Sequence, residues 1–307
     1  SCDYTDDVRI SPQILKSSAD SYRKIRNTLR FLLGNLYDFA PDKKVKYNKL
    51  LEIDRWALSS LAGLLTEVTE DFEQFRYDKA FRRIYNFCIH QMSHFYLDVL
   101  KDRLYTFDKE SSGRRSAQTA ICEILSALTK VLAPILSFTT EEVWRHLSKI
   151  LNVQDSSVVL LNAWPRIERR WINLTLDKKM QQLSKIRDGV LKAIENEREK
   201  NIIHSSLEAK VNLFVQDDKL YRLLQENLEL LVTIFIVSDV SLEKITSFSE
   251  SMLRPPDVSG LAVKVEKIDF PKCQRCWNYR VSVGKNSKHP QICQRCVEVI
   301  EGREKDE

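Results

Sequence analysis

The sequence is poor in the residues that form tight turns, because its 307 residues include only seven glycines and eight prolines. Leucine, lysine, glutamate and arginine are abundant instead, which favours a mainly helical protein. Long apolar runs are also missing: the run at residues 230–237 falls far short of the roughly 20 residues of a membrane span. We therefore expect a soluble protein with no membrane partner, whose 43% apolar content allows two or three domains.

The first residues lack both an initiator methionine and the apolar stretch of a signal peptide, so we expect a piece of a longer protein. Four of the seven cysteines form two CxxC pairs near the end, whereas Cys2, Cys88 and Cys122 have no partner spacing. This usage fits a reducing compartment better than a secreted disulfide framework. The net charge of +5 permits a polyanionic partner without requiring one.

Helical periodicity dominates the first 150 residues. Ser11-Pro12, a capping residue followed by proline, predicts the start of a helix whose apolar face includes Ile25 and Leu29. Cys88 falls on the apolar face of a later helix and is expected to be a core residue rather than a nucleophile. Further helices are expected over residues 49–75, over residues 78–104, and from a loop at residues 111–113 to near Pro134.

Thr139 and Glu142 match a capping box, which predicts that a fifth helix starts there and runs to about residue 149. The first domain is therefore a bundle of about five helices over residues 1–150. Residues 151–270 are expected to hold a linker, a long charged helix and a small α+β unit, followed by a finger and tail at residues 271–307. We predict the long helix at residues 177–200, and within the α+β unit strands at 207–215, 230–240 and 260–268 and a short helix at 217–227.

The tail carries the strongest chemical signal in the chain. Cys273 and Cys276 are separated by two residues, as are Cys293 and Cys296, and sixteen residues separate the pairs. This spacing is typical of four sulfurs around one tetrahedral zinc ion. Four protein ligands leave no position open for water, so the zinc is expected to be structural, supplying folding free energy to a module too small for its own core.

The predicted finger is strongly basic. Residues 271–297 contain no Asp or Glu, and zinc with four thiolates would leave the module at a charge of about +4. Trp277 and Tyr279 lie directly beside the first cysteine pair. Two interpretations stay open: phosphate contacts with stacking on an unpaired base, or Trp277 covering the zinc core beside solvated cations. The basic residues are Lys272, Arg275, Arg280, Lys285, Lys288 and Arg295.

Arg23, Arg26 and Arg30 are spaced to share one face of the first helix. Such a stripe could follow a nucleic-acid backbone, but arginines of this kind more commonly pair with carboxylates of a neighbouring helix. Arg82-Arg83 and Arg114-Arg115 are weaker candidates. His90 and His94 have the four-residue spacing of metal ligands, yet no third ligand is evident, so ordinary helix histidines are expected.

The chain closely resembles the C-terminal part of isoleucyl-tRNA synthetases of the bacterial and mitochondrial type, in order and over nearly its whole length. The segments that carry the resemblance are DYTDDVRIS, ILKSSADSYRKIRNTLRFLLGNL, EIDRWAL, FYLDVLKDRLYT, APILSFTTEEVW, CQRCWNY and ICQRC.

The resemblance implies a helical anticodon-binding domain, a junction unit and a zinc module that engage the anticodon stem and loop of isoleucine tRNA. It strengthens the assignment of RNA contacts to Trp277, Arg275 and Arg280, and less so to the arginines of the first helix. Lys285 and Arg295 are further candidates for RNA contacts. The parent enzyme of the family joins isoleucine to its tRNA with ATP. Neither its HIGH-type nor its KMSKS-type signature occurs here, and there is no editing domain, so this fragment is expected to be non-catalytic.

The resemblance also implies that an upstream catalytic domain of the same chain is a partner, and we expect a monomer with one structural zinc ion. The bacterial-type tail and the Lys- and Ser-rich linkers favour the mitochondrial matrix, with the bacterial cytoplasm as the alternative. Two other functions remain. One is a zinc-stabilised scaffold that binds only proteins. The other is a DNA-repair glycosylase with a similar finger, which fits poorly because those enzymes begin Pro-Glu and this chain begins Ser-Cys.

Overall fold

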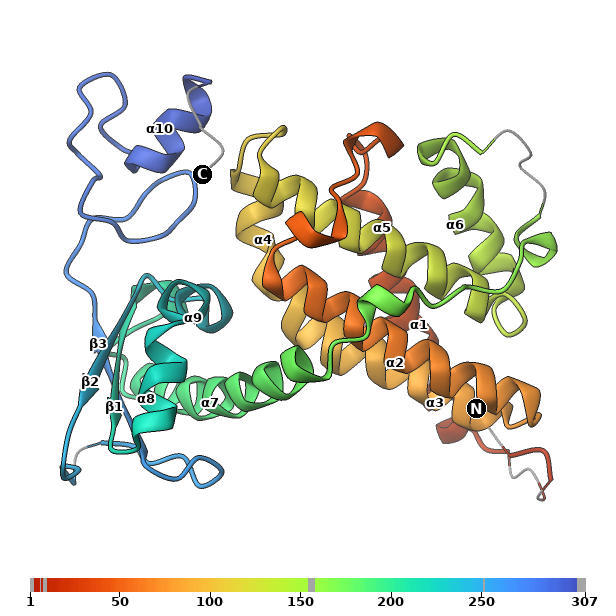
Figure 1. Ribbon diagram of the computed structural model, residues 1–307, viewed down its shortest axis with the longest axis horizontal. Helices are drawn as coiled ribbons and strands as arrows, with labels where there is room; N and C mark the ends of the chain where they lie inside the picture. The colour runs from red at the N-terminus through yellow and green to blue at the C-terminus, as the bar shows by residue number, and fades with distance from the viewer. Residues whose placement is uncertain (1–2, 6, 8–9, 154–157, 251, 303–307) are drawn as a thin grey trace. The chain divides into compact units, whose positions relative to one another are not determined.

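The computed structural model of the chain describes residues 3–5, 7, 10–153, 158–250 and 252–302 (Figure 1). These residues form two compact units. The boundary between the units in the chain falls within one helix, because the first unit ends at Asp177 and the second begins at Lys178. The predicted domain boundaries after residues 150 and 270 stay predictions. Cys2 lies outside the described residues.

The first unit is helical, as predicted. The second predicted helix is observed as α2. The predicted helix at residues 78–104 is observed as α3, a π-helical segment with wider turns, and α4, which follow one another without a break. The elements are α1 (Pro12–Gly34), α2 (Glu52–Glu73), α3 (Tyr77–Asn86), the π-helical segment Phe87–Tyr96, α4 (Leu97–Thr106), α5 (Ser112–Leu132) and α6 (Ser137–Ile150), with 3-10 turns at Pro41–Lys43, Tyr47–Lys49, Val159–Leu161 and Arg169–Trp171.

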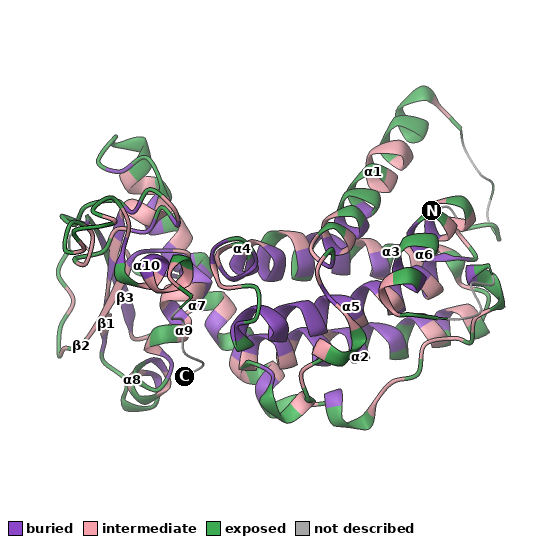
Figure 2. Ribbon diagram, turned by 90° about the horizontal axis from the view of Figure 1, so that it is seen from above, coloured by how far each residue is buried: buried purple, intermediate pink, exposed green. Residues whose placement is uncertain are grey.

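Helix α1 starts where the sequence predicts. The Ser11 hydroxyl accepts a hydrogen bond from the backbone N–H of Ile14, and Pro12 occupies the first turn. Ile25 and Leu29 are fully buried against the rest of the bundle, whereas the first turns of α1 project beyond it and are exposed (Figure 2). The predicted cap and the predicted apolar face are both confirmed.

Two predicted helix starts are wrong. Helix α6 begins at Ser137, so Thr139 lies inside its first turn, where its hydroxyl pairs with Tyr22 of α1 instead of capping the helix. Residues 112–113 are not a loop, because Ser111 caps α5 by accepting a hydrogen bond from the N–H of Arg114. Sequence patterns allow each helix to begin at either of two nearby residues, and a hydrogen bond seen only in the structure shows which one is used.

A charged network lies at the centre of the first unit. Both Asp54 oxygens receive 2.8 Å hydrogen bonds from the guanidinium group of Arg103, and Tyr96 and Ser116 donate to the same carboxylate. All four side chains are buried. Each partner therefore satisfies a group that would otherwise be stranded in an apolar core. Cys88 is also buried, and its predicted role as a core residue is confirmed.

The second unit contains a three-stranded sheet in the order β2-β1-β3, with β2 parallel and β3 antiparallel to β1. Alternate residues of β1 are buried on the face against which α8 and α9 pack (Figure 1). The elements are α7 (Leu174–Glu199), the 3-10 turn Ser206–Glu208, β1 (Ala209–Val215), α8 (Asp218–Gln225), α9 (Leu228–Phe235), β2 (Asp239–Lys244), β3 (Leu261–Lys267) and α10 (Gln294–Ile300). The predicted mainly helical fold with a small α+β unit is confirmed.

The predicted strand at residues 230–240 is wrong. That segment holds most of α9, ends its helix at Ile236 with a left-handed φ of +58°, and enters β2 only at Asp239. A continuous apolar run does not distinguish a buried strand from a buried helix. The fully buried residues Leu231, Ile234 and Phe235 nevertheless show helical spacing.

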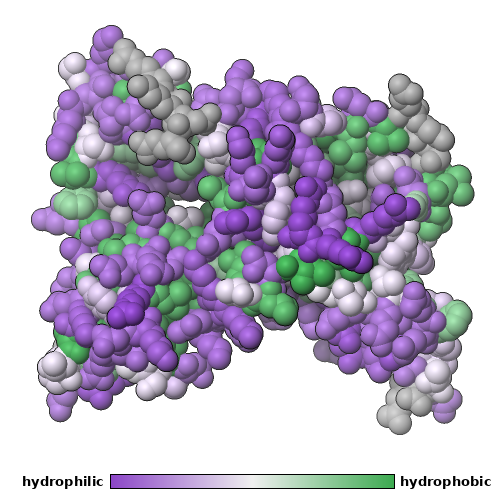
Figure 3. Space-filling model, in the orientation of Figure 1, coloured by the Kyte–Doolittle hydropathy of each residue, from purple (hydrophilic) through white to green (hydrophobic). Residues whose placement is uncertain are grey.

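In the described part of the chain, no helix is both long and apolar enough to cross a membrane. Hydrophilic side chains cover most of the face shown in Figure 3, and apolar side chains form only small groups on it.

Candidate metal centre and nucleic-acid surface

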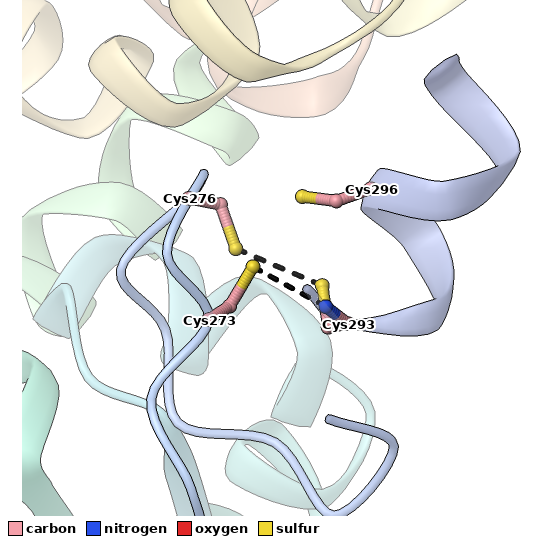
Figure 4. Close-up of side chains that lie close together, drawn as sticks. All are labelled: Cys273, Cys276, Cys293 and Cys296. Carbon is pink, nitrogen blue, oxygen red and sulfur yellow. Dashed lines mark hydrogen bonds between the residues drawn. The ribbon is translucent and has the colours of Figure 1, made fainter. Parts of the chain in front are cut away.

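The four predicted zinc ligands come together from two parts of the second unit. Cys273 and Cys276 lie on one turn, Cys293 caps α10, and Cys296 lies in the first turn of that helix (Figure 4). Their sulfurs all lie within 4.8 Å of one another, and all four residues are buried. Within the described ranges this is the only group of three or more His, Cys, Asp and Glu side chains close enough to share an ion.

The donor set fits zinc in chemistry and size. Four sulfurs about 2.3 Å from a central ion stand about 3.8 Å apart at the corners of a tetrahedron. The sulfurs of Cys276 and Cys293 are 3.8 Å apart. Zinc bound here would be coordinated by thiolates alone and would serve the fold rather than chemistry, since no ligand position is left open.

Neighbouring N–H groups also face the sulfurs. The backbone N–H of Cys293 lies 3.3 Å from the Cys273 sulfur, and the Arg275 guanidinium lies 3.5 Å from that of Cys296. These donors offset part of the negative charge that four thiolates bring. Hydrogen bonding within the cluster shifts the pKa values of two thiols in opposite directions. The contact between Cys276 and Cys293 lowers the pKa of Cys276 and raises the pKa of Cys293.

Backbone hydrogen bonds shape the first cysteine turn. The N–H of Trp277 donates to the carbonyl of Cys273 at 2.9 Å, and the N–H of Cys273 donates to the carbonyl of Asn278 at 2.9 Å. A third bond, from Gln274 to Gln291, ties this turn to the chain that precedes the second cysteine pair. The finger therefore has a closed backbone frame around the sulfurs.

Trp277 faces solvent. Its side chain is 62% exposed, and Val283 and Ile292 are the partly buried apolar residues that pack against the four cysteines. The ammonium group of Lys272 lies 5.7 Å from the centre of the indole ring. Trp277 also has a left-handed φ of +64°, a conformation that glycine or asparagine adopts at lower cost.

The predicted basic residues of the finger divide into two groups. Arg280 and Lys285 are exposed and form no ion pair with any described residue. Arg275 and Arg295 are half-buried beside the second cysteine pair. Lys272 was not singled out as a contact residue by sequence reasoning, because nothing in its spacing reveals that it would lie on the ring of Trp277.

The arginines of α1 are all exposed. Arg23 pairs with Asp20 of its own helix at 2.5 Å, whereas Arg26 and Arg30 have no ion pair among the described residues. Among the residues that the structure describes, none of these three arginines forms an ion pair with a neighbouring helix, which is the commoner arrangement for such a stripe. The structure brings the cysteines together, but whether any arginine contacts RNA stays a prediction.

The weaker basic candidates are paired internally. Arg83 binds Asp71 and Glu67, and Arg114 binds Asp38 while itself buried. Arg82 and Arg115 pair with Asp78 and with Glu110, respectively. His90 and His94 lie edge to face with ring centres 5.8 Å apart and, among the described residues, belong to no group of three possible metal ligands.

Comparison with known proteins matches both regions. The family described as "Anticodon-binding domain of tRNA ligase" matches residues 54–213, which is about half of the chain. The family described as "Zinc finger found in FPG and IleRS" matches residues 270–299, the segment that contains all four cysteines.

Bacterial relatives match almost the entire chain. The isoleucine–tRNA ligase of Caldicellulosiruptor saccharolyticus is 43% identical over 302 residues, covering 98% of this chain and 31% of the relative. The ligases of Caldanaerobacter subterraneus and Persephonella marina are each 42% identical, covering 98% of this chain and 32% of the relative. The chain thus spans about a third of the length of the relatives it matches. It belongs to the isoleucine–tRNA ligase family, whose anticodon-binding domain and type of zinc finger it carries.

Proposed function

We propose that this chain is the part of an isoleucine–tRNA ligase that binds the anticodon arm of isoleucine tRNA. In this proposal it positions the acceptor end of the tRNA in a catalytic domain of the same protein, where isoleucine is activated with ATP. The observation that carries the RNA contact is Trp277, a large aromatic side chain that is 62% exposed beside a cluster of zinc-binding type.

The environment of Trp277 suits an unpaired base. Lys272 lies over the indole ring, so a base would stack on the ring from the side that this lysine leaves open. The left-handed backbone at Trp277 costs about 1 kcal/mol or more relative to glycine. The fold alone would therefore be served better by glycine, which supports a role for the ring outside the fold.

Other cations of the finger supply the second part of the proposal. Arg280 and Lys285 are exposed without internal ion pairs among the described residues, so they can neutralise phosphates without first breaking a salt bridge. Arg275 and Arg295 extend the basic surface next to the cysteines. Base stacking would fix the anticodon loop, and these phosphate contacts would add affinity that weakens with salt.

Titration of the full chain with isoleucine tRNA and with a non-cognate tRNA, each at two salt concentrations, tests this function. Trp277→Ala should weaken binding of isoleucine tRNA by about 1 to 3 kcal/mol if the ring stacks on a base. Tyr105→Ala is the matched control, because Tyr105 is 59% exposed at the end of α4. Its affinity should equal that of the unaltered chain.

The alternatives give different results in the same titration. Unchanged tRNA affinity in a folded, zinc-loaded Trp277→Ala variant would assign the ring to the fold of the finger. Absence of tRNA binding by the unaltered chain would favour the protein-binding scaffold. A preference for duplex DNA would favour the glycosylase-like use of the finger.

The exposed face of α1 provides a second, electrostatic test. If Arg26 and Arg30 each contact a phosphate, replacing both with glutamine should reduce the slope of log affinity against log salt by about 2. Arg82→Gln is the matched control, because Arg82 is exposed but already paired with Asp78. An unchanged slope in the double variant would remove α1 from the RNA surface.

Three further points stay predictions of this proposal. The fragment should fail to catalyse isoleucine-dependent exchange between ATP and pyrophosphate, which a standard exchange assay measures. Sedimentation of the purified chain should give a monomer. Cell fractionation tests the predicted location in the mitochondrial matrix, for which the bacterial cytoplasm is the alternative.

A further inference from the structure

The two aromatic residues beside the first cysteine pair differ in their surroundings. Trp277 is exposed, whereas Tyr279 is half-buried and contacts residues that directly precede two strands of the sheet. The backbone N–H of Tyr279 donates a 2.8 Å hydrogen bond to the hydroxyl of Ser238. Ser238 is 3% exposed, directly precedes β2, and donates in turn to the carbonyl of Leu207 at 2.6 Å. A buried hydroxyl thus links the finger to the chain that enters β1.

The side chain of Tyr279 makes a second link at the same place. Burial, together with the charge of Glu208 and a hydrogen bond to it, raises the pKa of the Tyr279 hydroxyl. The backbone carbonyl of Glu208 also accepts a 2.8 Å hydrogen bond from the N–H of Ile268, at the end of β3 where the chain leaves for the finger. Glu208 therefore contacts the finger both directly and through the segment that leads into it.

These contacts close the base of the turn that carries Trp277. Lys272 and Tyr279 form an isolated antiparallel bridge, and the N–H of Arg280 donates to the carbonyl of Pro271 at 3.1 Å. The segment between these crossings contains Cys273, Cys276 and Trp277. Whatever holds Tyr279 on the sheet therefore also sets the direction in which the indole ring projects.

We propose that Tyr279 and Ser238 are positioning residues that fix the first zinc turn on the sheet, so that Trp277 is presented to an RNA base in one orientation. This inference rests on the proposed tRNA function for its consequence, but the anchoring itself does not depend on RNA. A finger that moved freely would have to be ordered when the tRNA bound, and that ordering lowers affinity without removing any contact.

The test uses the full chain with Tyr279→Phe and Ser238→Ala combined. These changes remove the tyrosine hydroxyl and the serine acceptor while leaving the four cysteines and Trp277 in place. The matched control combines Tyr221→Phe and Ser247→Ala, because in the described part of the chain neither side chain makes a hydrogen bond to the finger. Zinc content, ¹⁵N relaxation of finger and sheet amides, and tRNA affinity are measured for each protein.

In the unaltered chain and the control, finger and sheet amides should tumble together. In the anchoring variant the finger amides should show extra fast motion while zinc stays at one ion per chain, and tRNA affinity should fall by about three- to tenfold. Trp277→Ala should lower affinity without changing the relaxation of the finger. This separates the loss of the ring from the loss of its orientation.

Unchanged relaxation in the zinc-loaded anchoring variant would overturn the inference. So would a loosened finger that binds tRNA as tightly as the control in a protein whose affinity does depend on Trp277. If the unaltered chain does not bind tRNA, the proposed function fails, and if only Trp277→Ala has no effect, the stacking role of the ring fails; in both cases the relaxation result still decides whether Tyr279 anchors the finger. Should the variant lose zinc, Glu208→Ala combined with Ser238→Ala replaces it, since these changes remove both side-chain acceptors and alter no residue of the finger; a finger as rigid as in the control would then refute the anchoring.

Discussion

The cysteines of the helical unit and those of the finger show how the surroundings decide the chemistry of one residue type. Cys88 and Cys122 lie alone among apolar helix residues, and burial raises the pKa of both thiols to about 12, so they stay neutral. The four finger cysteines are equally buried, but their sulfurs lie within 4.8 Å of one another, where a cation can hold them as thiolates. A cysteine that is buried alone is a core residue, whereas four cysteines buried with their sulfurs close together can bind a metal ion.

The same contrast separates the two regions as wholes. The helical unit has a large apolar core, and its charged centre, Asp54 with Arg103, is satisfied by neighbouring side chains and by the backbone carbonyl of Gly113. The finger's own core is the cysteine cluster with two partly buried apolar neighbours, Val283 and Ile292. One region should therefore fold without metal and the other should not.

Removing one zinc ligand should break this contrast with the largest effect. Cys296→Ser should abolish tight zinc binding and unfold the finger, because structural zinc supplies an apparent free energy of about 10 to 16 kcal/mol in small zinc modules. Metal analysis reports the zinc, and NMR spectra of the finger amides report its fold. The helical content seen by far-ultraviolet circular dichroism should change little.

Cys122→Ala is the matched control, because it removes a buried thiol from α5 rather than from the cluster. It should keep one zinc ion per chain. Stoichiometric zinc in Cys296→Ser would contradict the role of Cys296 as a ligand. A collapse of the bundle on metal removal would contradict the independence of the two regions.

Disrupting the charged centre of the bundle should have the next largest effect, confined to the other region. Asp54→Ala leaves Arg103 buried without its carboxylate partner and should lower the free energy of unfolding of the bundle by about 3 to 5 kcal/mol. Urea unfolding followed by helical circular dichroism measures this loss.

Asp42→Ala provides the comparison, because Asp42 is exposed in a 3-10 turn and should shift unfolding by no more than about 0.5 kcal/mol. Zinc content should be unaffected in both variants. A small effect of Asp54→Ala would mean that the bundle can hydrate or relax around Arg103.

Features with a fixed local spacing could be predicted from the sequence. The zinc ligands follow from two CxxC pairs, and the start of α1 follows from Ser11-Pro12, because each depends on residues a few positions apart. Thr139 had an equally good local pattern, but its hydroxyl is used by Tyr22, 117 residues away. A sequence pattern of a few residues cannot reveal such a hydrogen bond between distant parts of the chain.

The candidate RNA surface shows the same limit. The spacing makes Arg83 a weaker candidate than Arg26 without revealing the reason, which is that Arg83 is held by Asp71 whereas Arg26 has no ion pair among the described residues. Spacing also places Tyr279 and Trp277 together beside the cysteines without showing that only Trp277 would be exposed. The difference between them comes from Ser238, which is distant in sequence and meets Tyr279 only in the folded unit.

The smallest expected effect tests the neutral state of the bundle thiols. The pKa of Cys88 is raised by burial from its ordinary value of 9.0 to about 12. Below about pH 9 the thiol is protonated in both states and adds no pH dependence. Between about pH 9 and 12 the unfolded state loses its proton first, so stability falls as pH rises, by up to about 1.4 kcal/mol per pH unit from this group.

Cys88→Ala removes this pH-dependent contribution to the free energy of unfolding. The stability difference between the unaltered chain and Cys88→Ala should therefore shrink above pH 9, whereas the difference for Val68→Ala, a buried position of α2 without a proton to lose, should stay constant. Urea unfolding at pH 8 and pH 10 measures both differences, and a Cys88 difference that does not change with pH would mean that the thiol ionises as readily in the fold as outside it.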